Sequence, residues 1–117
     1  MNSNYTQRVM NTLQRAQQNA ALRYHQEIGS LHVLLALAQE PEGLLATIFE
    51  EAKTDTNLLV NRLEQELRKI PSVKGQDRLT MSIELGRVMG KAELLAKSMN
   101  DDYISTEHLL LAIVQEG

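Results

Sequence analysis

Three histidines are the side chains of this sequence best suited to chemistry. His32 and His108 each stand in the first turn of an apolar helical phrase, and His25 precedes His32 by seven residues. Imidazole can ligate a metal or move a proton near neutral pH. A zinc site needs three or four converging ligands, and the chain has no HExxH pair and no cysteine. No serine or cysteine nucleophile accompanies the histidines either. We therefore expect no metal, no cofactor and no catalytic histidine, and instead side chains that hydrogen-bond or pack between neighbouring elements.

Residues 86–92, GRVMGKA, carry two glycines and a lysine, as a phosphate-binding loop does. The true motif has four residues between its glycines and Ser or Thr after the lysine. Here three residues separate the glycines and Ala92 follows the lysine, in the middle of an amphipathic segment. A phosphate cradle needs an open loop at a helix start. We expect no nucleotide site, and expect Gly86 and Gly90 to permit close helix packing.

The elements that must position these residues are predicted to be helices. Apolar residues recur every three or four positions, and alternating runs of β-branched and aromatic residues are absent, so we expect an all-α fold. Thr6, Asp55 and Ser82 stand where helix N-caps belong, and Pro41 can open a helix. The expected helices cover residues 7–23, 31–39, 42–52, 56–69 and 83–99, with one more at the end of the chain.

The buried stripes of the two longest expected helices follow from the same spacing. In the first helix they are Val9, Leu13, Ala16 and Ala20, and in the fifth Leu85, Val88, Met89, Ala92, Leu95, Ala96 and Met99.

Composition excludes several classes of function. A chain of 117 residues suits one domain, and a net charge of −3 with scattered basic residues and few aromatics disfavours nucleic-acid binding. No apolar run is long enough to span a membrane, and the start of the chain has no secretory pattern. The absence of cysteine excludes disulfides. We expect a cytoplasmic helical domain that contacts neither nucleic acid nor membrane.

The chain contains an internal repeat. A shift of 76 residues places Ile28 on Ile104, His32 on His108 and Thr6 on Ser82, together with the apolar residues around them. We therefore expect repeat one at about 6–70, a loop at 71–81 and repeat two at 82–117. Counterparts of residues 42–69 are missing from repeat two, so the second copy is truncated after its second helix. The face formed by Leu109, Leu110, Ile113 and Val114 should lose part of its cover.

The paired phrases IGSLHVLLALAQEPEG and YISTEHLLLAIVQEG, with NYTQRVMNTLQRAQQNA, resemble the double Clp repeat at the N-terminus of the Clp AAA+ chaperones. The loop RKIPSVKG and the phrase NDDYISTEH are most similar to the ClpB type. The resemblance covers the whole chain. It implies a pseudo-twofold helical bundle that is not itself catalytic and is tethered to an AAA+ ring of a parent ATPase.

That resemblance implies the function as well. A ClpB-type N-domain engages exposed apolar segments of unfolded or aggregated polypeptides weakly, for an ATP-dependent disaggregase of the stress response. The alternative within the family is an adaptor-docking N-domain of a ClpC- or ClpA-type unfoldase that works with a protease. Adaptor proteins are then the partners.

The resemblance also implies a site. Thr6, Asp101 and Glu107 match a polar surface cluster, although a helix cap, a helix-terminating turn and a first-turn acid explain them equally well. Apolar candidates for a groove between the repeats are Met89, Tyr103, Ile104 and Leu109, which a buried stripe would also explain. His108 stands where a more apolar residue is expected. The phosphoarginine-binding pattern of ClpC has an acidic residue before each repeat histidine. In this chain Glu107 occupies that position in repeat two, but Leu31 occupies it in repeat one.

Two other classes remain as alternatives. An enzyme could use Glu and His as an acid–base pair, although no converging set is evident in the sequence. A helical transcription regulator would need salt-sensitive DNA binding, against which the acidic charge argues.

Overall fold

The chain folds chiefly into helices, as expected for an all-α protein. The computed structural model describes residues 4–75 and 78–116. In chain order its elements are α1 (Gln7–Leu22), β1 (Glu27–Ile28), α2 (Ser30–Gln39), α3 (Leu44–Glu51), α4 (Thr56–Arg68), β2 (Thr80–Met81), α5 (Ile83–Ser98) and α6 (Thr106–Glu116). The helices α1 to α5 each begin and end within about two residues of the predicted bounds, and α6 is the further helix expected at the end of the chain.

Side-chain caps fix the starts of the two long helices. Thr6 Oγ1 accepts a hydrogen bond from the Val9 amide at 3.2 Å, and Ser82 Oγ accepts one from the Leu85 amide at 3.0 Å. Each bond satisfies an amide that has no partner within its helix. Asp55 caps α4 in the same way. The three predicted caps are confirmed.

Pro41 does not open α3, contrary to the expectation. The helix begins at Leu44 behind Gly43, and Pro41 and Glu42 lie in a turn closed by a hydrogen bond of 3.2 Å from the Gly43 amide to the Glu40 carbonyl. A Cβ atom on Gly43 would lie only 2.6 Å from Glu40 Cγ. The chain therefore reverses tightly between α2 and α3 before a helix can start.

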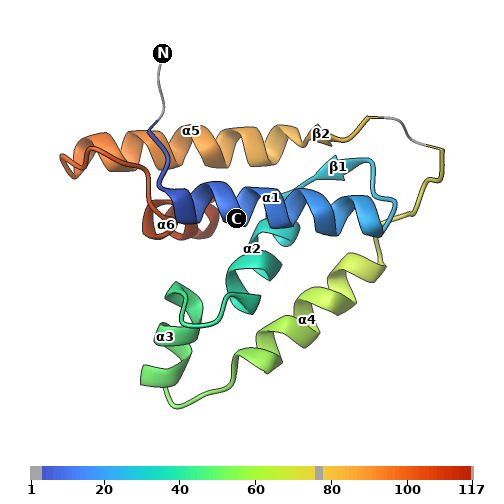
Figure 1. The fold of residues 1–117 in the computed structure, drawn as a ribbon, viewed down its shortest axis with the longest axis horizontal. Coiled ribbons are helices and arrows are strands. Elements are labelled where there is room, and N and C mark those ends of the chain that lie inside the picture. The colour runs from blue at the N-terminus through green and yellow to red at the C-terminus, as the bar shows by residue number, and fades with distance from the viewer. Residues whose placement is uncertain (1–3, 76–77, 117) are drawn as a thin grey trace.

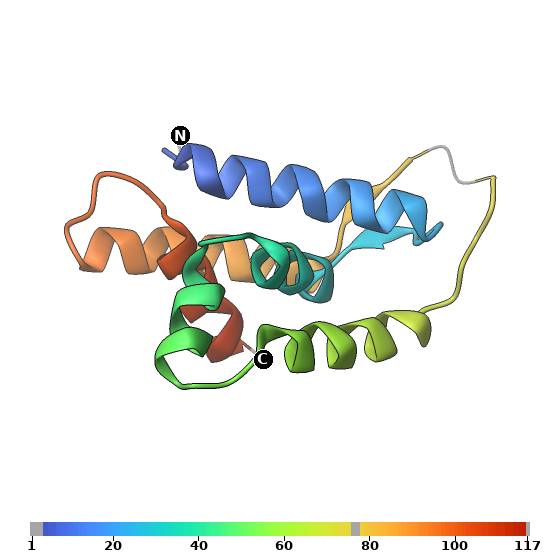
Figure 2. The same cartoon turned by 60° about the horizontal axis from the view of Figure 1, so that its bottom comes forward.

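The helices pack in a sequence of pairs. α2 lies between α1 on one side and α4 on the other, while α5 packs chiefly on α6 (Figure 1). Figure 2, a second view of the same ribbon, shows α1 and α4 on opposite sides of α2. The core lies where these helices meet, and it contains most of the predicted stripe residues: Val9, Ala16, Ala20, Leu85, Val88, Met89, Ala92 and Ala96.

Three stripe residues depart from the prediction. Leu13 and Leu95 are half-buried, and Met99 is exposed because it follows the last turn of α5 as its C-cap. Thr12 is buried in α1 instead of Leu13. The core face of α1 is thus rotated slightly away from Leu13, which leaves that side chain near the surface.

The two repeats hold each other through reciprocal backbone pairing. Ile28 in β1 pairs in parallel with Met81 in β2, and Tyr5 forms the equivalent bridge with Ile104. The Thr6 amide donates to the Ile104 carbonyl at 3.0 Å, as the Ser82 amide donates to the Ile28 carbonyl at 2.9 Å. The segment that leads into each long helix is therefore held by the other repeat.

The second helices of the two repeats differ in their cover. Leu35 of α2 is 0% exposed, whereas its equivalent in α6, Leu111, is 40% exposed. α4 packs on α2, and no described element packs on α6 in the corresponding way. Leu111 was not among the residues expected to lose cover. The expected loss is seen at Val114, which is exposed, and in part at Leu110, which is half-buried. It is not seen at Leu109 and Ile113, which are buried.

Gly86 and Gly90 do not serve close helix packing, so that expectation is wrong. A Cβ atom added at either position would meet nothing within 4 Å beyond the helix's own backbone. Both glycines lie on the exposed side of α5.

Candidate functional site

The two long helices, α1 and α5, end in turns of the same type. Each turn positions the residue that hydrogen-bonds to the histidine of its repeat, His32 or His108. Tyr24 and Asn100, equivalent in the repeats, adopt left-handed backbone conformations with φ of 57° and 59°. Behind them the His25 amide bonds to the Ala20 carbonyl at 3.0 Å, and the Asp101 amide bonds to the Ala96 carbonyl at 2.9 Å. This pattern closes a helix with a Schellman-type turn.

In repeat one the turn brings His25 against His32. His32 Nδ1 accepts a hydrogen bond from the Gly29 amide at 2.9 Å, so its ring proton must lie on Nε2. His32 Nε2 then donates to His25 Nδ1 at 2.8 Å. Both rings are buried and both are neutral in this arrangement.

In repeat two the same positions hold Asp101 and His108. His108 Nδ1 accepts from the Ser105 amide at 2.9 Å, and its Nε2 donates to Asp101 Oδ2 at 2.7 Å. An imidazole and a carboxylate therefore replace the two imidazoles of repeat one. In each repeat the histidine joins the start of its helix to the end of the preceding long helix, which confirms the expected hydrogen-bonding role.

The surroundings of the histidine pair disfavour protonation. Burial, and then the charge of Arg23, lower the pKa of His25. Burial is also the main cause at His32, followed by the charges of His25 and Arg23, and together they lower its pKa from 6.5 to about 4. Within residues 4–75 and 78–116, no three His, Asp or Glu side chains converge as a metal site would require.

The predicted polar residues gather at one end of the molecule. Thr6 begins α1, Asp101 follows α5 and Glu107 lies in the first turn of α6. The pairing of Tyr5 with Ile104 brings these three segments together. Thr6 is half-buried, Asp101 is engaged by His108, and Glu107 is exposed.

The predicted apolar residues separate into two groups. Tyr103 is well exposed at this same end. Met89, Ile104 and Leu109, by contrast, are buried in the core, and so is His108. These side chains pack α5 on α6 and the N-terminal segment, so their surfaces are taken up by the protein itself. Helical spacing alone does not separate a core stripe from a binding stripe, which is why they were candidates.

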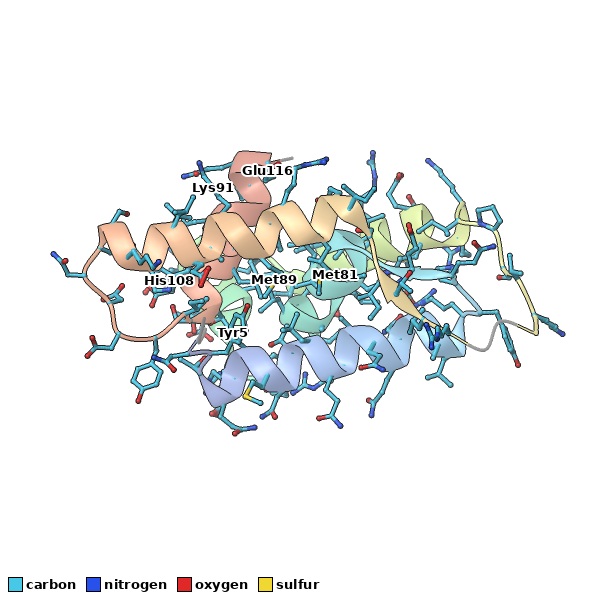
Figure 3. The ribbon with its side chains drawn as sticks, turned by 90° about the horizontal axis from the view of Figure 1, so that it is seen from above. Tyr5, Met81, Met89, Lys91, His108 and Glu116 are labelled. Atoms are coloured by element: carbon cyan, nitrogen blue, oxygen red, sulfur yellow. The ribbon has the colours of Figure 1, made fainter. Side chains whose placement is uncertain are left out.

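A groove along α1 contains residues that the sequence did not single out. It has a volume of about 490 Å³. Its apolar floor is formed by Tyr5, Met10, Leu13, Ile28, Met81 and Leu85. Figure 3 shows Tyr5 and Met81, which are equivalent in the two repeats, in the space between α1 and α5. α1 packs chiefly on α2 and α5 chiefly on α6, which leaves this space between them.

The rim of the groove is uncharged. The polar residues that line it are all amides of α1, namely Gln7, Asn11, Gln14 and Gln17. Lys91 points to the other side of α5 in Figure 3, on the side where Arg87 pairs with Glu116. Amide side chains both donate and accept hydrogen bonds, as a polypeptide backbone does. An apolar floor beside an amide rim suits a peptide of any charge.

The fold therefore defines a class of protein, a pseudo-twofold helical bundle with an apolar groove along its first long helix. The model of the Clp repeat (R) N-terminal domain matches residues 4–117. The chain therefore belongs to this family, and the resemblance seen in the sequence is confirmed.

Individual relatives agree. The chaperone protein ClpB of Bacillus cereus is 35% identical over 115 residues, which cover 95% of this chain. The chain spans 13% of the length of that relative. The Hsp104 N-terminal domain from Candida albicans is similar in structure, with a TM-score of 0.89 and 24% identity over 97% of this chain and 75% of that one. A ClpV N-domain in complex with a VipB peptide has a TM-score of 0.75, with 18% identity over 95% of this chain and 68% of that one.

No helix in the described ranges is both long enough and apolar enough to cross a membrane.

Proposed function

We propose that this chain is the non-catalytic, substrate-engaging N-domain of a ClpB-type ATP-dependent disaggregase. It binds exposed apolar segments of unfolded or aggregated polypeptides and delivers them to the AAA+ ring of its parent chain. The observation that carries the proposal is the groove between α1 and α5, with its apolar floor and uncharged amide rim.

The floor supplies the affinity. Burying apolar client side chains against Met10, Leu13 and Met81 releases water from both surfaces. Methionine suits varied clients because its flexible thioether adapts to different shapes. The groove is open along α1, so a client is held by a limited area and binding is micromolar or weaker.

The amide rim supplies tolerance of sequence. Gln14 and Gln17 would hydrogen-bond to the backbone of an extended client, which every sequence presents. At one end of the groove, Tyr5 pairs with Ile104, which follows Tyr103 and shortly precedes Glu107 in the first turn of α6. Glu107 there would favour clients with basic flanks, which extends the binding surface beyond the groove.

The proposal is tested by methyl NMR with reduced, carboxymethylated α-lactalbumin as a permanently unfolded client. We expect shifts at the Met10, Met81 and Leu85 methyl groups. Met99 and Leu58, which are exposed but do not line the groove, serve as internal controls. Folded α-lactalbumin should produce no shifts. An unchanged spectrum at high client concentration would contradict the proposal.

A second candidate is the docking of a defined partner peptide, as in an adaptor-binding N-domain of a ClpC- or ClpA-type unfoldase. The ClpV N-domain that is similar in fold was solved with a VipB peptide, which supports this candidate. The two functions differ in selectivity. A pulldown that retains one folded adaptor and no unfolded client would favour docking.

A further inference from the structure

Two methionine side chains of this protein are exposed in the groove. The chain has no cysteine, so its thioethers are its only sulfur atoms. Met10 and Met81 line the groove with 53% and 48% of their surfaces exposed, and they lie on different elements, α1 and β2. Met89 is buried in the core, and Met99 is 53% exposed at the end of α5, outside the groove.

We propose that Met10 and Met81 form an oxidation-sensitive modification site that switches polypeptide binding off. The inference rests on the proposed function of the groove and adds its regulation. The oxidant is a peroxide. One oxygen atom passes to the thioether sulfur, a sulfur–oxygen bond forms, and the peroxide bond breaks. Sulfur loses two electrons, and hydrogen peroxide is reduced to water.

The product changes the chemistry of the groove floor. A thioether is apolar and flexible, whereas a sulfoxide is polar and holds water. Covering a sulfoxide with an apolar client side chain removes that water without supplying a hydrogen-bond donor. Met10 stands on α1 and Met81 lies in β2, two residues before the start of α5, so oxidation makes both sides of the groove polar.

The site is selective because exposure controls the reaction. Met89 is shielded by the packing of α5 on α6 and reacts slowly. Met99 is as exposed as Met10 and reacts at a similar rate, but it cannot affect a client in the groove. Met99 is therefore a matched control within the same chain. Sulfoxide formation is reversible by methionine sulfoxide reductases, so the groove returns to its apolar state.

The experiment first measures binding of carboxymethylated α-lactalbumin to the untreated protein, and absence of binding at this step would refute the proposed function alone. The protein is then treated with hydrogen peroxide, and oxidised residues are mapped by mass spectrometry. We expect sulfoxides at Met10, Met81 and Met99 before Met89. Binding should weaken about tenfold, equivalent to about 1.4 kcal/mol.

Two variants assign the effect. The double variant Met10→Leu, Met81→Leu removes both thioethers from the groove at nearly constant volume. Whatever its starting affinity for the client, that affinity should be the same after peroxide as before it. Met99→Leu should remain as sensitive as the original chain. The inference is overturned if the oxidised protein binds normally, if the double variant still loses binding, or if circular dichroism shows that binding was lost by unfolding.

Discussion

His108 donates a hydrogen bond of 2.7 Å from Nε2 to Asp101 Oδ2, in the position where repeat one joins His32 to His25. The two repeats thus keep one geometry with different chemistry. Each link fastens the start of a helix to the turn that ends the preceding long helix. The polar residues at these links therefore have structural roles, whatever they contribute to binding.

Removing the carboxylate of Asp101 should destabilise the fold. In Asp101→Ala the buried Nε2–H of His108 loses its acceptor, and we expect a loss of about 1–2 kcal/mol in the free energy of unfolding. Urea denaturation measures this loss. Asp102→Ala changes an exposed neighbouring acid and is the control. Equal effects of the two substitutions would contradict the role of the Asp101–His108 bond.

Stability should fall in mild acid because of His32. Its pKa in the folded protein is about 4, below its ordinary 6.5, so the unfolded chain binds protons more readily between these values. The free energy of unfolding is therefore highest above pH 6.5, where His32 is neutral in both states, and it decreases as the pH falls to about 4. At about 1.4 kcal/mol per pH unit, the loss reaches about 3 kcal/mol. Urea denaturation from pH 7 to pH 4 measures it.

A variant that copies the chemistry of repeat two tests the cause of that loss. His25→Asp places a carboxylate beside His32, as Asp101 stands beside His108. A neighbouring negative charge favours the protonated imidazole. The loss of stability between pH 6.5 and pH 4 should therefore be smaller in this variant. A loss as large as in the unsubstituted chain would show that another group is responsible.

Equivalent leucines of the two repeats should differ in energetic weight. Leu35→Ala removes a fully buried side chain and should cost about 2–5 kcal/mol. Leu111→Ala removes one that is 40% exposed and should cost about 1 kcal/mol or less. Thermal and urea unfolding compare the two variants. Similar costs would mean that Leu111 is covered in solution.

Two glycines should respond to alanine in opposite directions. Gly90→Ala adds a methyl group to an open helix surface and should stabilise the fold by about 0.5–1 kcal/mol. Gly43→Ala forces Glu40 to move and should destabilise it by about 1–2 kcal/mol. Melting temperatures of the two variants check both signs. A stabilising Gly43→Ala would show that the turn relaxes freely.

Local signals predicted the local structure well. The caps at Thr6 and Ser82 and the helix ends near Tyr24 and Asn100 depend on residues close in the chain, and the repeat of 76 positions supported each of them independently. The failure at Pro41 has a local cause too. A first-turn proline and a proline in a tight turn have similar flanking residues, and only the reversal after Glu40 decides between them.

The site was harder to predict because it depends on long-range pairing. Met81 lay in an expected loop, and only its pairing with Ile28 places it in the groove. Met10 lies outside the predicted buried stripe of α1. An apolar residue in that position was the one feature of the sequence that could have indicated a surface groove. Leu109 was misjudged in the opposite direction. Its apolar spacing suited a binding face, but the folded protein buries it in the core.

The reciprocal pairing of Tyr5 with Ile104 and of Ile28 with Met81 has a consequence for how the chain assembles. Neither repeat holds its own leading segment, so neither half is expected to fold when expressed alone. Two halves divided in the loop after Val73 should instead find each other and complement in trans. Mixing the separate fragments should restore helical circular dichroism, and unfolding of the intact chain should proceed as one cooperative step.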